Sequence, residues 1–388
     1  MNILVVDDNP TNVMLIREIL RKDGYQRIST ASCAQEMYQH LGLDYSGKSE
    51  DAHPKEPDVD LILLDMMMPE IDGLQACRHI QQLNHLRDIP IIMVTAVADS
   101  NILADALDAG AVDYVTKPVN RIELLARIRL ALRLKQEKDW HKERDYHIRQ
   151  ELRLAAKVQE SVLTEPYEDQ AITIKAIYRP SEELAGDLYA WFPLSNGKYG
   201  VLILDMMGHG VSSALLCMYI ASALRTTVKS EAAPDIVLQQ LNAKFDQLYM
   251  NDSLTLYYMT AIYVIVDTKN DVIRYANAGH PPGIVVMENG EVIQMETTGH
   301  PVGMFPELHI DVKEISCTHR FRVGLYTDGL VESSVQSLDM AIADLTELVK
   351  TETDIDDSLS WQQLFENESL HEDDKCLVWV DVHHRQGV

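Results

Sequence analysis

The first 121 residues alternate between short apolar strands and helical segments. Apolar runs at residues 2–6, 28–31, 61–64, 89–94 and 112–115 read as strands, and residues 11–21 and 34–41 repeat their apolar side chains with the helical period. Five strands alternating with five helices predict a parallel, doubly wound five-stranded α/β sheet. Such a sheet places its functional site outside the carboxyl ends of its strands.

Polar side chains stand at those carboxyl ends: Asp7, Asp8, Asp65, Thr95 and Lys117. Three neighbouring carboxylates repel one another unless a divalent cation lies among them, and Mg²⁺ binds through carboxylates while keeping waters and phosphoryl oxygens. The lysine and threonine would bind phosphoryl oxygens if one aspartate were phosphorylated. The strand ends therefore predict a magnesium-dependent phosphorylation site.

The segments VVDDN, LLDMMMPEIDG, VTA and YVTKP resemble the receiver domain of two-component response regulators, over residues 1–121. The resemblance implies that Asp65 is the phosphoacceptor and that Thr95 and Lys117 bind the phosphoryl group. It implies Mg²⁺ ligands at Asp7, Asp8, Asp65 and the Met67 carbonyl, and an upstream histidine kinase or phosphotransfer protein as partner. Tyr114 matches the switch aromatic of the family, with a core tyrosine as the alternative. The polar stretch Asp44 to Pro57 is expected to be a loop without assigned function.

Residues 122–163 contain no glycine and no proline, which predicts one continuous helical linker. A weak heptad seam runs through Leu134, His141, Ile148, Ala155 and Val162. Two alternatives remain open for this helix: a coiled coil, which would make the protein a homodimer, and a solvated spacer.

The remaining residues, 164–388, centre on the sequence VLILDMMGHGVSSA at 201–214. An acid at the end of a buried strand, here Asp205, requires a metal ion, a basic partner or a strand end that reaches solvent. Further acids stand in similar settings at Asp187, Asp328 and Asp373 with Asp374. Four such positions in one domain predict hard cations.

The strand pattern of this second domain is antiparallel. Residues 172–178 and 199–206 read as strands, and hairpins are expected around Lys269-Asn270 and Asn289-Gly290. Helices at 211–228 and 234–249 lie between strands. Hairpins joined to clustered helices predict an α+β layered structure.

Eight motifs in order resemble the PPM-type metal-dependent Ser/Thr phosphatases of the bacterial SpoIIE-like branch: LAAKVQESVL, AGDLY, LDMMGHGVSSALL, MTAIYVIVD, YANAGHPPG, PVGM, LYTDGLVE and DDKCLVWV. The resemblance implies an antiparallel β-sandwich flanked by helices, with two Mn²⁺ or Mg²⁺ ions in a cleft between the sheets. The matching catalytic ligands are Asp187, Asp205, the Met206 carbonyl, Asp328 and Asp373. The ions would activate water for in-line attack on phosphoserine or phosphothreonine.

Several positions of this domain leave alternatives open. Asp373 is favoured over Asp374 as the ligand. Ala190 and Cys376 stand where the family often has an acid and usually a threonine, which leaves room for altered metal affinity. His209 and His280 are candidate general acids, with a turn residue as the alternative; Gly208, Gly210 and Gly279 are expected to serve backbone geometry.

The combined resemblance implies a response regulator whose output is a protein phosphatase. The family relation implies a phosphorylated anti-sigma-factor antagonist of the STAS type as substrate, in a bacterial general-stress or related pathway. The alternative is a non-catalytic adaptor that binds a regulatory protein in a phosphorylation-dependent way; retention of the four acids favours the enzyme.

Composition bears on partners and compartment. The formal net charge of −26 argues against a nucleic-acid partner, which would require clustered lysine and arginine. Five separated cysteines indicate free thiols in a reducing cytosol. The chain opens directly on an apolar strand, and no apolar run reaches membrane-spanning length, so a cytoplasmic protein without membrane contact is expected.

Overall fold

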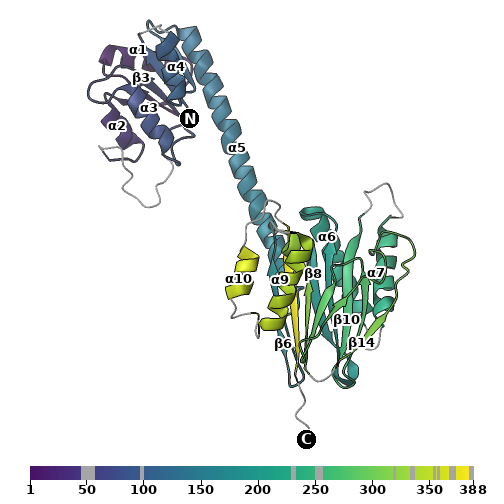
Figure 1. Cartoon of the computed structure of the whole chain (residues 1–388). Coiled ribbons are helices and arrows are strands. Elements are labelled where there is room, and N and C mark those ends of the chain that lie inside the picture. The colour runs from purple at the N-terminus through teal and green to yellow at the C-terminus, as the bar shows by residue number, and fades with distance from the viewer. Residues whose placement is uncertain are drawn as a thin grey trace. The chain divides into compact units, whose positions relative to one another are not determined.

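The computed structural model describes residues 1–44, 57–96, 100–228, 233–249, 257–317, 320–332, 337–352, 355, 359–366 and 373–383. The chain divides into two compact units, Met1–His147 and Ile148–Val388. One long helix, α5 (Arg121–Glu160), contributes to both units (Figure 1). Most of the predicted loop from Asp44 to Pro57, namely residues 45–56, lies outside the described residues.

The first unit is the predicted parallel sheet. Its strands are β1 (Asn2–Val6), β2 (Arg27–Ala31), β3 (Leu61–Asp65), β4 (Ile91–Thr95) and β5 (Asp113–Thr116). They are arranged in the order β2-β1-β3-β4-β5, and every pair is parallel. Their carboxyl ends therefore meet at one edge, as the doubly wound fold requires.

Helices cover both faces of this sheet: α1 (Pro10–Lys22), α2 (Ala34–His40), α3 (Gly73–Gln82), α4 (Ser100–Asp108) and the start of α5. One core joins α1 and α5 to the sheet through Ile16, Leu20, Leu124 and Ile128. The opposite core contains Met37, Ile80 and Ala106 from α2, α3 and α4. This layering confirms the α/β prediction.

The first turns of α5 belong to the first unit by their packing. Leu124, Leu125, Ile128 and Leu132 are buried in its core. Beyond them, Lys138 and Lys142 form ion pairs with Asp88. The boundary between the two compact units lies after His147, within the helix.

The second unit contains two antiparallel sheets. The first sheet has the order β14-β11-β10-β9-β8 and is built from β8 (Asp187–Pro193), β9 (Lys198–Met206), β10 (Met259–Asp267), β11 (Val272–Ala278) and β14 (Lys313–Ser316). The second has the order β13-β12-β15-β16-β7-β6 and is built from β6 (Tyr167–Glu168), β7 (Ile172–Arg179), β12 (Gly283–Met287), β13 (Val292–Met295), β15 (Phe321–Tyr326) and β16 (Lys375–Val382). The expected hairpins are β10–β11 and β12–β13.

Apolar side chains pack between the two sheets, including Ile203, Val264, Val323 and Val378. Helices α6 (Val211–Thr227) and α7 (Pro234–Tyr249) cover the outer face of the first sheet. Helices α8 (Gly329–Glu332), α9 (Leu338–Thr351) and α10 (Leu359–Glu366) cover the second (Figure 1). A short 3₁₀ turn, Ser195–Gly197, joins β8 to β9. The predicted antiparallel sandwich flanked by helices is confirmed.

The five cysteines are free thiols, and four of them are buried. Among the described residues, no helix combines the length and apolarity needed to cross a bilayer.

Candidate functional site

The first unit gathers its predicted polar residues at the carboxyl edge of the sheet. Lys117 Nζ lies 2.9 Å from Asp7 Oδ2 and 2.9 Å from Asp65 Oδ1. Asp7, Asp8 and Asp65 each present a carboxylate oxygen within 4.8 Å of the other two. In the described part of the chain, no other group of three or more His, Cys, Asp or Glu side chains comes this close.

Two asparagines and the lysine hold this acidic cluster in place. The Asn9 backbone N–H and the Asn12 side-chain amide donate to Asp7 Oδ1 at 2.9 and 3.1 Å. Burial raises the pKa of Asp65, and the bond from Lys117 partly offsets this rise. Burial by itself would lower the pKa of Lys117, but the bonds to Asp7 and Asp65 outweigh it and leave the lysine charged. The three oxygen donors fit a hard cation such as Mg²⁺.

Of the other predicted receiver residues, Met67 follows β3, Thr95 ends β4 and Tyr114 lies within β5. Thr95 ends β4 and is fully buried. Met67 follows Asp65 by two residues with an exposed side chain, and its N–H bonds to the Asp65 carboxylate. Tyr114 is half-buried against the α2–α4 core, and the Arg127 guanidinium carbon lies 5.4 Å from its ring centroid.

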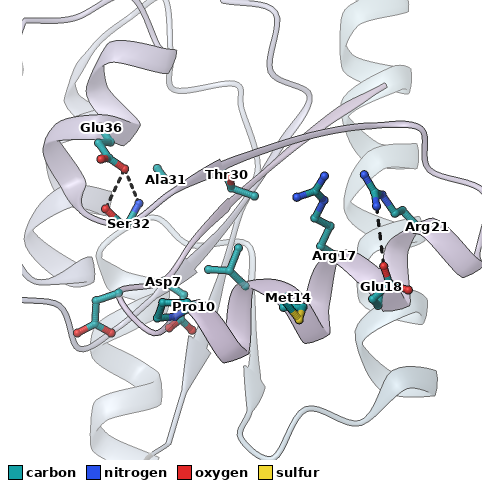
Figure 2. Close-up of a pocket in the computed structure, with 12 residues that line it drawn as sticks. Asp7, Pro10, Met14, Arg17, Glu18, Arg21, Thr30, Ala31, Ser32 and Glu36 are labelled. Atoms are coloured by element: carbon teal, nitrogen blue, oxygen red, sulfur yellow. Dashed lines mark hydrogen bonds and ion pairs between the residues drawn. The ribbon is translucent and has the colours of Figure 1, made fainter.

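Beside the acidic cluster, a hollow of about 540 Å³ runs along α1 and β2. Figure 2 shows Asp7 and Pro10 at one end and Arg17 and Arg21 farther along α1. Arg21 lies 3.9 Å from Glu18 in a solvent-exposed pair. The hollow leaves the acidic end of the sheet accessible from the α1 side.

In the second unit, three polar side chains form a row across neighbouring strands. Asp187 of β8 pairs in register with Asp205 of β9, which pairs with Thr260 of β10. Directly opposed residues project to the same face. Strand alternation places this face toward the space between the sheets, because Ile203 and Ile262 on the same side belong to the inter-sheet core.

The facing sheet supplies two more acids. Asp328 follows β15, and Asp373 stands two residues before β16 with an exposed side chain. Gly329 lets these ends approach, because a Cβ on it would lie 2.1 Å from the Asp374 carbonyl oxygen. Burial and the neighbouring Asp328 and Asp373 carboxylates raise the pKa of Asp205 to about 8, and burial also raises the pKa of Asp328 to about 6. The acids of the two sheets thus lie within electrostatic reach of each other.

Asp187 is the most deeply buried of these acids, at 1% exposure. Burial, followed by the charge of Asp205, raises the pKa of Asp187 well above its usual range. Its Oδ2 atom is buried and accepts no hydrogen bond from the described residues. No lysine or arginine among them forms an ion pair with Asp187, Asp205, Asp328 or Asp373. A buried oxygen without a donor, in an all-oxygen acidic set, fits a divalent cation.

Asp374 is held differently from Asp373. Its carboxylate accepts hydrogen bonds from Ser181 N at 2.8 Å, Ser181 Oγ at 2.9 Å and Gly186 N at 2.7 Å. The Asp374 side chain therefore anchors the segment that leads into Asp187. This arrangement leaves Asp373 as the freer carboxylate of the two.

The two departures from the family pattern have separate surroundings. Ala190 is three residues from Asp187, so strand alternation directs it to the opposite, helix-covered face of β8. Cys376 is fully buried in the inter-sheet core, and its N–H donates to Thr327 Oγ1 at 3.0 Å.

The two candidate histidines differ in exposure. His280 is 2% exposed, with Nδ1 2.8 Å from Thr260 Oγ1, and burial lowers its pKa to about 3. His209 is exposed, and its Nδ1 lies 3.2 Å from Glu182 Oε1. The flanking Gly208 and Gly210, like Gly279, have positive φ angles of 82°, 85° and 71°, in agreement with their predicted backbone role.

Sequence reasoning missed the two threonines of this site. Thr260 extends the row of acids on β10, and buried Thr327 sits between β15 and Asp328. Each lies within one of the matching motifs, Thr260 in MTAIYVIVD and Thr327 in LYTDGLVE. Strand pairing was needed to place Thr260 beside Asp205.

Two protein families match the chain in separate segments. The family "Response regulator receiver domain" matches residues 3–129. The family "Stage II sporulation protein E (SpoIIE)" matches residues 195–383.

Curated relatives are each similar to part of the chain. Phosphoserine phosphatase RsbP of Bacillus subtilis is 34% identical over 243 residues, which are 60% of this chain and 58% of RsbP. The signal transduction histidine-protein kinase BarA of Shigella flexneri is 38% identical over 124 residues, 32% of this chain and 12% of BarA. The chain thus spans less than two thirds of the length of either relative.

Among solved structures, the SiaA-PP2C domain of Pseudomonas aeruginosa superposes with a TM-score of 0.50 at 18% identity. The superposition covers 61% of this chain and 97% of that domain, and it supports the fold of the second unit. The chain therefore carries an N-terminal segment that matches the receiver-domain family and a C-terminal segment that matches the SpoIIE family.

Proposed function

We propose that this protein is a metal-dependent Ser/Thr protein phosphatase controlled by phosphorylation of its receiver domain at Asp65. One observation carries the proposal: Asp187 and Asp205 pair in register on the inner face of one sheet, and Asp328 and Asp373, beside strand ends of the facing sheet, lie within electrostatic reach of Asp205. The similarity to a phosphoserine phosphatase over 60% of the chain supports the same activity.

The proposed metal ligands are Asp187, Asp205, the Met206 carbonyl, Asp328 and Asp373, which would hold two Mn²⁺ or Mg²⁺ ions. When bound, such ions neutralise phosphoryl charge and activate water for hydrolysis. The protein contributes the geometry: paired strands fix Asp187 against Asp205, and the close approach of Gly329 to Asp374 fixes the opposite side.

We propose His209, rather than His280, as the general acid that protonates the leaving oxygen. A general acid must reach the substrate and hold a proton near neutral pH. His280 is enclosed and neutral because its pKa lies near 3, whereas His209 is exposed beside Glu182. We therefore place His209 at the substrate side of the site and assign His280 to the support of Thr260.

For the input site, we propose Asp65 as phosphoacceptor, with Mg²⁺ held by Asp7, Asp8, Asp65 and the Met67 carbonyl. Lys117 already contacts Asp65, so it is placed to bind a phosphoryl oxygen there, together with Thr95. Tyr114 is proposed as the side chain that responds to the phosphorylated state. The phosphodonor would be a histidine kinase or phosphotransfer protein.

The proposed substrate is a phosphorylated anti-sigma-factor antagonist of the STAS type. The proposed assembly is a homodimer through the α5 seam, where Leu134 and Ile148 are 54% and 42% exposed. Exposed apolar residues at heptad spacing favour pairing of two helices.

The test uses the full chain, Mn²⁺ and a phosphorylated STAS-domain protein, with and without an acyl-phosphate donor that phosphorylates Asp65. We expect phosphate release from the STAS protein, at a rate that the donor changes in wild type and leaves unchanged in Asp65→Asn. Binding of the STAS protein without any phosphate release would contradict the enzyme and support an adaptor. Equal rates with and without the donor would contradict control by Asp65.

A further inference from the structure

The last turn of α5 contains a buried polar side chain in an otherwise exposed stretch. Between residues 136 and 160, all of which the structure describes, Gln159 is the only buried residue, at 3% exposure. Burying a glutamine is costly unless its amide is fully hydrogen-bonded. The hydrogen-bond partners of Gln159 therefore show which segment the end of α5 is attached to.

Gln159 makes two hydrogen bonds to one residue outside the helix. Its Nε2 donates to the Ala185 carbonyl at 2.7 Å, and its Oε1 accepts from the Ala185 N–H at 3.1 Å. This bidentate contact fixes both the position and the orientation of the Ala185 backbone. Ala185 stands two residues before Asp187.

The next residue, Gly186, is fixed from two other sides. Its N–H donates to Asp374 Oδ2 at 2.7 Å, and its carbonyl accepts from Met206 N at 3.3 Å. It also packs closely on the β9 turn, since a Cβ on Gly186 would lie 3.2 Å from the Met206 and Gly208 carbonyl oxygens. The Ala185–Gly186 segment thus links α5 to both Asp187 and the Met206 carbonyl.

A second tie joins the residues after α5 to the same strand. Thr164 Oγ1 accepts from Trp191 N of β8 at 3.3 Å, and Val162 and Leu163 pack against the α6–α7 core. In the described part of the chain, β8 is the edge strand of its sheet and pairs only with β9. The strand that carries Asp187 is therefore bordered by β9 on one side. The end of α5 is hydrogen-bonded to Ala185 just before this strand, and Thr164, after α5, is hydrogen-bonded to Trp191 within it.

We infer that Gln159 is a positioning residue for the phosphatase metal site. Its two hydrogen bonds to the Ala185 backbone hold Asp187 in place beside Asp205, and this placement determines the metal affinity of the site. The inference rests on the proposed function, because it presumes that Asp187 and Asp205 bind the metal. Displacement of the α5 end would loosen Ala185 and lower metal affinity without altering any ligand. The receiver domain would thereby control the output through metal occupancy.

Calorimetric titration of the full chain with Mn²⁺ tests the inference. All samples carry Asp8→Asn, so that the receiver acids contribute little binding. Gln159→Met keeps the length of the side chain and removes both hydrogen bonds. Gln159→Glu keeps the acceptor for the Ala185 N–H and loses the donor. Gln150→Met is the matched control, because Gln150 is an exposed glutamine of the same helix.

We expect Gln159→Met to weaken Mn²⁺ binding about 10-fold or more, as loss of groups that orient metal ligands does. Gln159→Glu should fall between Gln159→Met and the reference, and Gln150→Met should match the reference. Hydrolysis of an aryl phosphate by Gln159→Met should recover to within about twofold of the reference at saturating Mn²⁺, since every ligand remains.

Mn²⁺ binding by folded Gln159→Met as tight as that of the reference would overturn the inference. If Gln159→Met does not fold, tight binding by Gln159→Glu would overturn it in the same way. Asp205→Asn separates the two proposals. If Asp205→Asn loses binding while the Gln159 variants keep it, only the role of Gln159 fails. If Asp205→Asn binds like the reference, the proposed metal site fails and the inference with it.

Discussion

Asp187 and Asp205 are direct register partners across the antiparallel strands β8 and β9, so their carboxyl groups lie side by side on one face of the sheet. Burial raises the pKa of both carboxyl groups, that of Asp205 to about 8, so this pair retains a proton near neutral pH in the absence of a cation. A divalent cation would replace this proton. Metal binding, stability and pH are therefore linked at this pair.

The linkage predicts that the metal-free protein loses stability as pH rises from about 5 to 8. In the unfolded chain these carboxyl groups ionise near pH 4, whereas in the fold the pKa of Asp328 is about 6 and that of Asp205 about 8. Between these values the unfolded chain has released protons that the folded chain retains, so rising pH favours unfolding. Thermal unfolding of the second unit in chelator, followed across this pH range, measures the effect.

Mn²⁺ should reverse this trend, because it binds the ionised carboxylates. The rise in melting temperature on adding Mn²⁺ should be larger at pH 8 than at pH 6. Asp205→Asn should lose most of both effects. Melting temperatures in chelator that rise with pH over this range would contradict the assignment of these raised pKa values.

Substitutions of Asp373 and of Asp374 should have different effects on stability and on activity. Asp374→Ala removes the acceptor of three hydrogen bonds and leaves Gly186 N–H unpaired, which should lower the free energy of unfolding by about 2 kcal/mol or more. Asp373→Ala removes an exposed side chain that accepts one hydrogen bond, from Asp374 N at 2.8 Å, so its unfolding free energy should fall by about 1 kcal/mol at most. Its Mn²⁺-dependent hydrolysis should nevertheless fall at least about 10-fold. Chemical denaturation and an aryl phosphate assay on both variants decide the assignment, and full activity in Asp373→Ala would make Asp374 the ligand.

Phosphorylation of the receiver should require both Asp65 and Lys117. Incubated with an acyl phosphate and Mg²⁺, the full chain should gain one phosphoryl group by mass spectrometry, and Asp65→Asn should gain none. Lys117→Ala should react about 100-fold more slowly, because it loses a charged donor to the phosphoryl oxygens. A fragment ending at Arg121 would lack Leu124 and Ile128 of the receiver core, so the full chain is required. Phosphate on Asp65→Asn would place the acceptor elsewhere.

Control of the phosphatase by the receiver should depend on the heptad phase of α5. Seven residues inserted between His147 and Ile148 preserve the heptad phase, whereas two residues rotate the following helix by about 200°. This position leaves the Asp88 pairs with Lys138 and Lys142 intact. We expect the seven-residue variant to retain donor-dependent phosphatase activity and the two-residue variant to lose it. If both respond like wild type, α5 transmits no rotational information.

Much of the architecture could be predicted from local sequence patterns. Strand-end acids such as Asp65 follow apolar runs whose period and length are visible in the sequence, and a parallel sheet brings such ends together. The helix from Arg121 to Glu160 follows from the absence of glycine and proline. The division of that helix between two units could not be predicted, because it depends on which of its side chains find a core.

The contacts that set the metal site were harder to predict. The pairing of Asp187 with Asp205 requires the register of β8 and β9, and the distinct surroundings of Asp373 and Asp374 require the path of residues 181–186. The sequence shows Gln159 only as a polar residue near the end of a predicted helix, and the fold is needed to show that its side chain binds the Ala185 backbone.

Hydrolysis of an aryl phosphate by the purified full chain, titrated with Mn²⁺, tests the proposed phosphatase site most directly. The comparison is wild type, Asp205→Asn and, as a matched control, Asp344→Asn, which alters an exposed acid on α9. Wild type and Asp344→Asn should show the same Mn²⁺-dependent rate, and Asp205→Asn should fall at least about 100-fold while keeping its fold. Hydrolysis by Asp205→Asn equal to that of wild type, or no Mn²⁺-dependent hydrolysis by wild type, would contradict a metal-dependent phosphatase at this site.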